Sequence, residues 1–196
     1  MTDKTVRAKA RTGWVVGVLS LSGVVVALQQ TLVVPVLPAF ATASGVSSST
    51  ASWLVTSTLL TGAVATPLIG RLADMFGKKK MLLVAFSMMT LGSMLCALSS
   101  DIAVLIFARA LQGAGSAVIP IGISMLRDEL PRNKVNGAVA MMSSTLGVGT
   151  ALGIPFSAMI AQYSNWHVLF WVTTAIGLSV TLAAVLFIRE SEPNPS

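Results

Sequence analysis

The chain is predicted to turn at Gly70-Arg71-Leu72-Ala73-Asp74-Met75-Phe76-Gly77-Lys78-Lys79-Lys80, a charged stretch between two long apolar segments. The flanking segments, about 51–70 and 81–99, contain no charged residue. Gly70 and Gly77 permit close approach of other groups and positive φ angles, because glycine has no Cβ. A short charged loop between two uncharged apolar segments is typical of a connection between membrane helices.

Composition points to the same environment. Hydrophobic residues make up 54% of the 196 residues and charged residues 10%, whereas a soluble domain has about 25% charged residues. A spanning helix needs about 20 mostly apolar residues, and backbone groups in lipid must be paired within helices or closed barrels. The sequence therefore predicts an all-α membrane protein. Its six predicted transmembrane helices are about 13–40, 51–70, 81–99, 102–126, 138–161 and 167–188, between tails 1–12 and 189–196.

The basic residues predict the orientation. They fall in the two tails and in alternate connections, and the other connections, around 41–50, 99–101 and 162–167, have no Lys or Arg. By the positive-inside rule, both termini are expected to be cytoplasmic in a multi-pass protein of the plasma or inner membrane. The basic residues concerned are Lys4, Arg7, Lys9, Arg11, Arg71, Lys78, Lys79, Lys80, Arg127, Arg132, Lys134 and Arg189.

Several other classes of protein are disfavoured. The net charge of +6 is explained by topology and anionic lipid, so nucleic acid is not an expected partner. A secretory signal has an apolar core of about 7 to 15 residues, and the run from Trp14 to Phe40 is longer. Cys96 is the only cysteine, so an intramolecular disulfide is excluded. No metal spacing, nucleophile with a base or buried carboxylate pair is present, so no metal and no catalytic residues are expected.

Proline positions suggest an internal repeat. Pro67 and Pro155 lie at similar depths in the second and fifth predicted helices, while Pro35 and Pro38 in the first correspond to Pro120 in the fourth. Inverted three-helix repeats with interrupted helices are a known transporter arrangement. We therefore expect two inverted three-helix repeats, with paired helices broken at similar depths.

Arg109 is the only charged residue inside the predicted membrane region. A guanidinium in lipid costs at least a few kcal/mol, so it normally faces protein or a wet cavity. Gln112 and Gly113 share its helical face, and Gln29 and Gln30 lie at similar depth in the first helix. Two readings stay open: a polar cavity wall that takes part in coupling, or a side chain that pins helices by bonding backbone carbonyls or Gln29 and Gln30.

The fifth predicted helix carries a stripe of small residues at every fourth position. Such a stripe lets another helix approach closely, and both packing and a role in a conformational switch are open. The stripe is Thr145, Gly149, Gly153, Ser157 and Ala161, with Pro155 beside it. Adaptable methionines and an aromatic ring are candidate linings of a substrate cavity, namely Trp53, Met141 and Met142, while Trp166 is expected to anchor a helix end at the interface.

Two of these motifs resemble signatures of the major facilitator superfamily of transporters. The loop reads G-x-L-A-D-x-x-G-K-K-x in outline, and 105–117 resembles the superfamily's R-x-x-Q-G-x-G motif. The resemblance implies half of a major-facilitator fold and a loop that contacts the other half and locks the cytoplasmic side. The residues implied in this latch are Gly70, Arg71, Asp74, Gly77, Lys78 and Lys79. Asp74 is expected to accept hydrogen bonds from a helix N-terminus.

The segment 28–38 resembles a drug:proton antiporter segment, but Gln29 stands where that segment usually has Asp. The fifth helix departs as well, because Gly153-Ile154-Pro155-Phe156-Ser157-Ala158 replaces the antiporter pattern G-P-x-x-G-G. All seven acidic residues lie in tails, loops or helix ends. If an ion gradient is used, with protons the first candidate, the titrating group is therefore expected elsewhere.

The expected function is the N-terminal bundle of a secondary transporter, with efflux of multiple drugs or small lipophilic molecules by alternating access. The expected partners are membrane lipid, a small-molecule substrate and a second six-helix bundle, either the chain's own C-terminal half or another copy. No cofactor is expected. The alternative is a non-transporting, half-size membrane scaffold that oligomerises through the stripe on the fifth helix.

Overall fold

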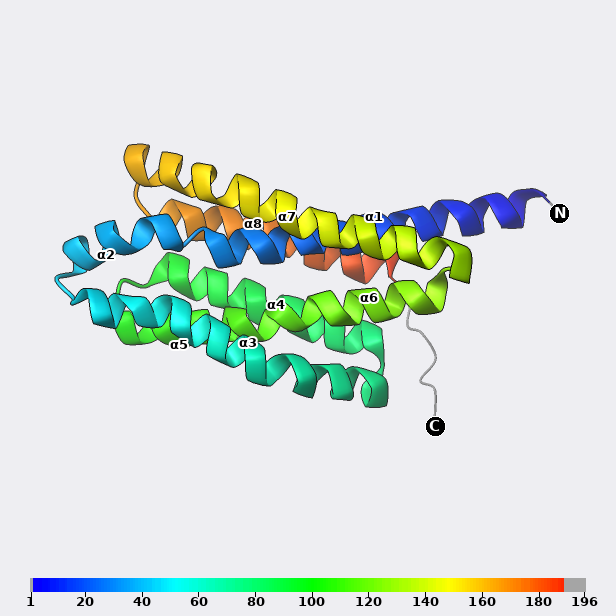
Figure 1. The fold of residues 1–196 in the computed structure, drawn as a ribbon, viewed down its shortest axis with the longest axis horizontal. Helices are drawn as coiled ribbons and strands as arrows, with labels where there is room; N and C mark the ends of the chain where they lie inside the picture. Colours follow the sequence, from blue (N-terminus) through cyan, green and yellow to red (C-terminus); the bar gives the residue numbers. More distant parts are fainter. Residues whose placement is uncertain (1, 189–196) are drawn as a thin grey trace.

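Helices joined by short turns make up nearly all of the residues that the computed structural model describes, which are residues 2–188. They lie side by side in an elongated bundle, and no strand occurs among these residues (Figure 1). The elements are α1 (Thr2–Thr31), η1 (Val34–Val36), α2 (Leu37–Ser44), α3 (Ser48–Phe76), α4 (Lys78–Leu98), α5 (Ile102–Ala114), η2 (Gly115–Ala117), α6 (Val118–Glu129), α7 (Arg132–Tyr163) and α8 (His167–Phe187). The predicted tail 189–196 lies outside the described residues.

Six of the helical stretches are long and apolar enough to cross a membrane. The first combines α1 and η1 over Gly13–Val36, and the fourth combines α5, η2 and α6 over Ile102–Glu129. The others are α3, α4, residues 132–160 of α7, and α8. The prediction of an all-α protein with six membrane helices is confirmed. The predicted tail 1–12 is helical from Thr2 onward and continues directly into the first span.

Prolines interrupt two of the spans. Pro35 cannot donate a backbone hydrogen bond and crowds the carbonyl four residues earlier, and α1 ends at that residue, Thr31. Pro120 has the same effect on Ser116, which lies in the 3-10 turn η2 between α5 and α6. By contrast, α3 and α7 continue through Pro67 and Pro155. The expectation of matching breaks is therefore wrong for the second and fifth spans.

One glycine makes the reversal between α3 and α4. Gly77 has φ of +103° and is both the C-cap of α3 and the N-cap of α4. This value lies in the region that favours glycine. The predicted turn is thus shorter than expected, because α3 continues through Phe76. Gly70 lies within α3 and does not use the positive φ that glycine permits.

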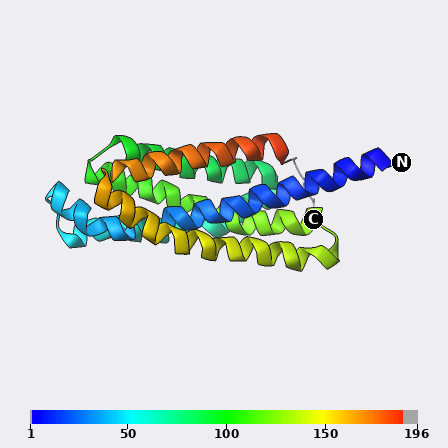
Figure 2. The same ribbon diagram turned by 90° about the horizontal axis from the view of Figure 1, so that it is seen from above.

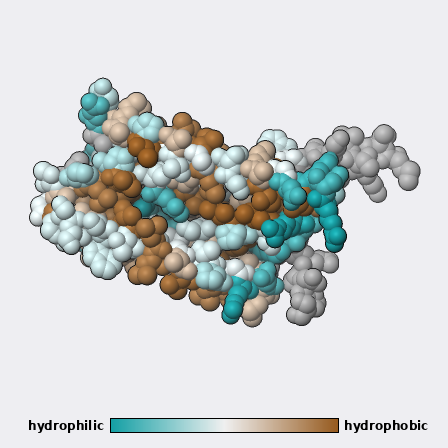
Figure 3. Space-filling view, viewed as in Figure 1, coloured by the Kyte–Doolittle hydropathy of each residue, from teal (hydrophilic) through white to brown (hydrophobic). Residues whose placement is uncertain are grey.

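The connections with basic residues lie at one end of the bundle. The α3–α4 and α6–α7 turns lie at the same end as the start of α1, and the other connections lie at the opposite end (Figure 1). Figure 3 shows most of the strongly hydrophilic surface at that end and an apolar band along the middle. Lys79 and Lys134 thus share one end of the bundle, as the charge pattern requires. The cytoplasmic assignment of that end stays a prediction.

Helix pairing follows the predicted repeat. The most extensive helix contacts include α1 with α7 and α3 with α5, and Figure 2 shows α1 and α7 crossing. When the first three spans are exchanged with the last three, these two pairs map onto each other. Both pairs have glycine contacts: a Cβ on Gly149 would lie 2.6 Å from the Val24 carbonyl oxygen, and one on Gly113 would clash with the backbone of Thr58.

Two spans leave most of their surface uncovered. Of the apolar window in each span, 28% of the residues are buried in α3 and 17% in α7, against 39% to 61% in the other four. The buried core lies chiefly among α1, α4, α6 and α8, where Leu82, Phe86 and Met125 are fully enclosed. The outer faces of α3 and α7 are therefore open to lipid or to another helical unit.

We predict that Gly149→Ala destabilises the bundle by about 1–3 kcal/mol, because the new methyl group meets the Val24 backbone and the Ala27 side chain on α1. The measurement is thermal unfolding in detergent. Gly147→Ala on the same helix is the matched control, since no atom lies within 4 Å of its added Cβ. Equal melting temperatures for the two variants would contradict the close α1–α7 contact.

Candidate functional site

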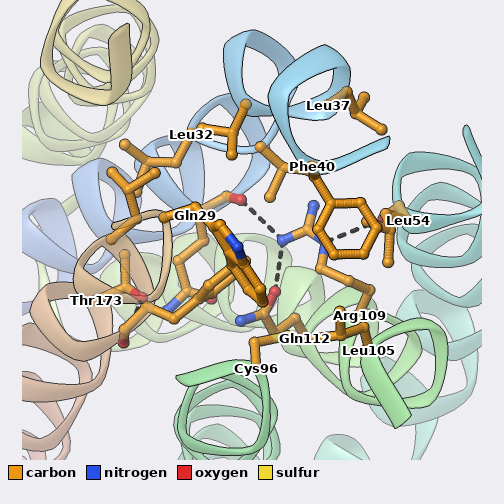
Figure 4. A pocket seen from close by; sticks show the side chains of 15 residues that line it. Gln29, Leu32, Leu37, Phe40, Leu54, Cys96, Leu105, Arg109, Gln112 and Thr173 are labelled. Carbon is orange, nitrogen blue, oxygen red and sulfur yellow. Dashed lines mark hydrogen bonds between the residues drawn. The ribbon is translucent and has the colours of Figure 1, made fainter. Parts of the chain in front are cut away.

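The charged centre of the bundle is Arg109 on α5, which is 2% exposed. Its Nε donates to the Leu54 carbonyl oxygen of α3 at 3.0 Å, and its Nη1 donates to the Gln29 carbonyl oxygen of α1 at 3.0 Å. Nη1 also donates to Oε1 of Gln112, one turn further along α5. Figure 4 shows the guanidinium between these three partners. Arg109 therefore bonds backbone carbonyls of two other helices, as the second of the two predicted readings requires.

The break in the first span explains why the backbone carbonyl of Gln29 is free to accept a hydrogen bond from Arg109. Because α1 ends at Thr31, the Gln29 carbonyl lies in the last helical turn, where carbonyls lack an intrahelical partner. Arg109 supplies a donor at this position. Charge-assisted hydrogen bonds are about twice as strong as neutral ones. The guanidinium therefore fixes the end of α1 against α3 and α5.

Gln112 extends the cluster to α4. Its Nε2 donates to Ser93 Oγ at 2.8 Å, and Ser93 Oγ donates to the Met89 carbonyl oxygen at 3.1 Å. Thr58 on α3 donates from Oγ1 to the Arg109 carbonyl oxygen at 3.0 Å. Four helices are thus joined by one buried hydrogen-bond network. Hydrogen bonds to charged groups contribute about 1.5–3 kcal/mol each, so this network is a major tie between the spans.

A cavity of about 20 Å³ lies beside Arg109, which is enough for one water molecule. Its wall is mostly apolar, with Gln29, Arg109, Gln112 and Thr173 as polar members (Figure 4). Both polar atoms of the Gln29 side-chain amide are buried without a hydrogen-bond partner among the described residues. The second terminal nitrogen of Arg109, Nη2, also has no partner there. The cavity therefore borders an incompletely bonded polar centre.

The other intramembrane candidates divide between this cluster and its surroundings. Gly113 faces Thr58 on α3, where any side chain would collide with backbone atoms. Gln30 donates from Nε2 to Ser116 Oγ at 3.3 Å and does not line the cavity. Only the first of the two predicted glutamines therefore joins the site.

The middle of the stripe on α7, at Gly149, Gly153 and Ser157, is buried within the bundle. A Cβ on Gly149 or Gly153 would meet α1, at Val24 and Thr31 respectively, and Ser157 is fully buried. Pro155 is exposed on another face of the helix. The stripe therefore packs α7 on α1. This placement leaves the scaffold alternative without the exposed stripe that it requires.

The predicted substrate-cavity residues do not line the cavity. Trp53 is 50% exposed and Met141 is 44% exposed, both on the outer surface of the bundle. Met142 is fully buried in the main core beside Gly122. The expectation that Met142 lines an open cavity is therefore wrong for this bundle, because its face of α7 packs inward.

Aromatic residues that the sequence analysis did not assign to a site close one side of the cavity. Trp166 packs edge-on against Phe40 of α2 and Phe170 of α8, with ring centroids 5.3 and 6.0 Å apart. All three line the cavity. Trp166 was expected to be an interface anchor at a helix end; it is half-buried just before α8, where it also packs against these two rings. The local sequence around Trp166 has no signal for this contact, which depends on where α2 folds back.

The loop residues at the basic end are held in different ways. Lys78 forms an ion pair with Asp128 at the end of α6, and Lys79 Nζ donates to the Val185 carbonyl oxygen of α8 at 3.2 Å. Asp74 is exposed on the last turn of α3. No partner for Asp74 occurs within residues 2–188, so the expected bond to a helix N-terminus is not formed inside this bundle. Arg71 is also exposed on α3.

Metal-binding groups are not assembled in this part of the chain. No cluster of three or more His, Cys, Asp or Glu side chains that could hold a metal ion occurs among the described residues. Cys96 is buried in the cavity wall as a free thiol. The arrangement around Arg109 suits hydrogen bonding and electrostatic work.

Comparisons with known proteins agree with this architecture. The family model of the Major Facilitator Superfamily matches residues 19–196. MdtD of Escherichia coli strain K12, a protein named for multidrug resistance, is 31% identical over 176 residues, which cover 89% of this chain and 37% of MdtD. MdtD of Shigella sonnei gives the same values.

Solved structures share the fold. The proton:xylose symporter XylE has a TM-score of 0.81 at 15% identity, over 93% of this chain and 46% of that one. The human organic anion transporter MFSD10 (TETRAN) has a TM-score of 0.66 at 20% identity, over 91% of this chain and 48% of that one. The chain spans less than half the length of each relative named here. From its matched sequence and its six-helix fold, the chain belongs to the major facilitator superfamily of transporters.

Proposed function

We propose that this chain is the N-terminal bundle of a secondary transporter that expels multiple drugs or small lipophilic molecules. The bundle would work by alternating access with a second six-helix bundle, supplied either by further sequence of the same protein or by another copy. The similarity to MdtD supports the substrate class. The observation that carries the two-bundle proposal is the uncovered surface of α3 and α7.

The open faces have the character that a second bundle requires. On α3, Leu60, Val64 and Leu68 are each more than half exposed, and on α7 Leu152 and Met159 are as well. Lipid alone could cover these apolar side chains. However, the aligned portion of each relative is less than half of that relative, and this ratio favours a neighbouring bundle as the occupant of at least part of the surface.

The α3–α4 loop is proposed as the contact that locks one conformation. Lys78 and Lys79 tie the start of α4 to α6 and α8, so the loop is positioned by its own bundle. Asp74 stands exposed beside it. A carboxylate is stabilised by the free amides of a helix N-terminus. We propose that the second bundle presents such a terminus to Asp74.

The Arg109 cluster is proposed to keep the bundle rigid while it moves. Its hydrogen bonds join α1, α3, α4 and α5 at one depth. Alternating access consists largely of rigid-body rocking of one bundle against the other, and such rocking requires that the helices within a bundle stay together. Arg109 thus has a positioning role in this proposal.

An ion gradient, with protons as the first candidate, is the proposed energy source. No carboxylate lines the cavity formed by the described residues, where Gln29 occupies the antiporter position. Gln cannot titrate. A titrating group would therefore be supplied by another part of the transporter.

We predict that Asp74→Asn and Arg109→Ala each abolish efflux in the complete protein. Asp74→Asn removes the charge that the lock requires, and Arg109→Ala removes two hydrogen bonds to other spans and one within α5. The measurement is export of a fluorescent lipophilic cation from efflux-deficient cells, with the membrane level of each variant quantified.

Asp101→Asn is the matched control for Asp74→Asn. It removes the same charge at the opposite end, and Asn still caps a helix as Asp101 caps α5. Efflux should therefore be retained in this variant. Normal export by both Asp74→Asn and Arg109→Ala at normal membrane levels would refute the proposed function.

We also predict that the basic end faces the cytoplasm. A membrane-impermeant maleimide should label Gln162→Cys on intact cells and should label Lys134→Cys only after the cells are opened. The native Cys96 is buried and stays unlabelled. The reverse labelling pattern would invert the proposed orientation.

A further inference from the structure

We propose that the cavity beside Arg109 binds one small monovalent anion, of about the size of chloride, held by the guanidinium and by the side-chain amide of Gln29. The proposal concerns a ligand of this bundle and does not depend on whether the protein expels drugs. It rests on the charge, the unpaired groups and the dimensions of the cavity.

Charge is the first feature of the cavity that favours an anion. Arg109 is buried within the membrane region, and its three acceptors are neutral: two backbone carbonyls and one amide. A buried cation is normally paired with an opposite charge, because desolvation costs several kcal/mol. No Asp or Glu lines the cavity, and the described acidic side chains lie at the bundle ends. The described residues thus leave the positive charge uncompensated.

Hydrogen-bond donors without an acceptor are the second feature of the cavity that favours an anion. Nη2 of Arg109 has two N–H groups with no acceptor among the described residues. The Gln29 side chain is 4% exposed, and its amide nitrogen is one of the buried atoms without a partner. Leaving a buried polar group unbonded costs about 1–3 kcal/mol. Both residues line the cavity, so an anion held there would supply the missing acceptor and would neutralise Arg109.

The size of the cavity is the third feature that favours a small anion. A cavity of about 20 Å³ has room for about one water-sized particle. Most of the wall is apolar, and Phe40, Trp166 and Phe170 pack together on one side. Low polarity strengthens the attraction between an enclosed anion and the guanidinium. A water molecule would match the size but would bring no charge, so the two occupants can be distinguished by experiment.

The test is the melting temperature of the purified full chain in detergent, titrated with sodium chloride against sodium gluconate at equal ionic strength. A ligand that binds the folded state raises the melting temperature with concentration. We expect chloride to stabilise the wild-type protein and gluconate, which is too large for the cavity, to have no such effect. Equal responses to the two salts would overturn the proposal and would fit a bound water.

Two variants identify the site. Gln29→Asp places a carboxylate beside Arg109, so this variant should be stable without chloride and should lose the chloride response. Gln29→Leu removes the donor, so the apparent chloride affinity should fall about tenfold. Gln30→Leu is the matched control, because its side chain bonds Ser116 outside the cavity, and its chloride response should equal that of the wild type. A chloride response that persists unchanged in Gln29→Asp would place the anion elsewhere and refute this site.

Discussion

A single guanidinium inside the apolar region sets the main constraint on this bundle. Arg109 is tolerated there because its Nε and Nη1 groups are bonded, and the partners they find are carbonyls on α1 and α3 and an amide on its own helix. The Gln29 carbonyl is available because Pro35 ends α1 just beyond it. The end of α1 thus supplies an acceptor to Arg109, and Arg109 supplies a donor to the otherwise unpaired Gln29 carbonyl.

The glycine contacts act on the same pairs of helices. Gly113 lets α5 approach α3 closely enough for Thr58 to reach the Arg109 carbonyl, and Gly149 lets α7 approach α1. Membrane helices gain little from the hydrophobic effect against each other, so close backbone contact and hydrogen bonds provide most of their association. Polar bonding at Arg109 and close packing at the glycines therefore support each other.

Much of this architecture could be predicted from local sequence patterns. Apolar runs of sufficient length predict the six spans, and a lone charge in such a run predicts that Arg109 is enclosed by protein. The stripe on α7 was readable because small residues recur at helical spacing. By contrast, whether Gly70 or Gly77 makes the turn depends on how far α3 extends, and the residues between them do not stop a helix.

The parts that could not be predicted depend on tertiary contacts. Gln29 was a candidate for its side chain, but Arg109 bonds its backbone carbonyl, which no sequence pattern specifies. The cavity wall brings Phe40 and Trp166 together from segments more than a hundred residues apart. Met142 was a candidate for a cavity because methionine is adaptable, whereas the rotation of α7 directs it into the core.

The single-residue link at Gly77 has a mechanical consequence. Only Gly77 lies between α3 and α4, so the link is too short to let the two helices slide along each other. Since α4 is bonded to α6 and α8 at this end, a force applied to the tip of α3 is transmitted to three other helices. The single-residue link at Gly77 thus couples the tip of α3 to α4 and, through Lys78 and Lys79, to α6 and α8.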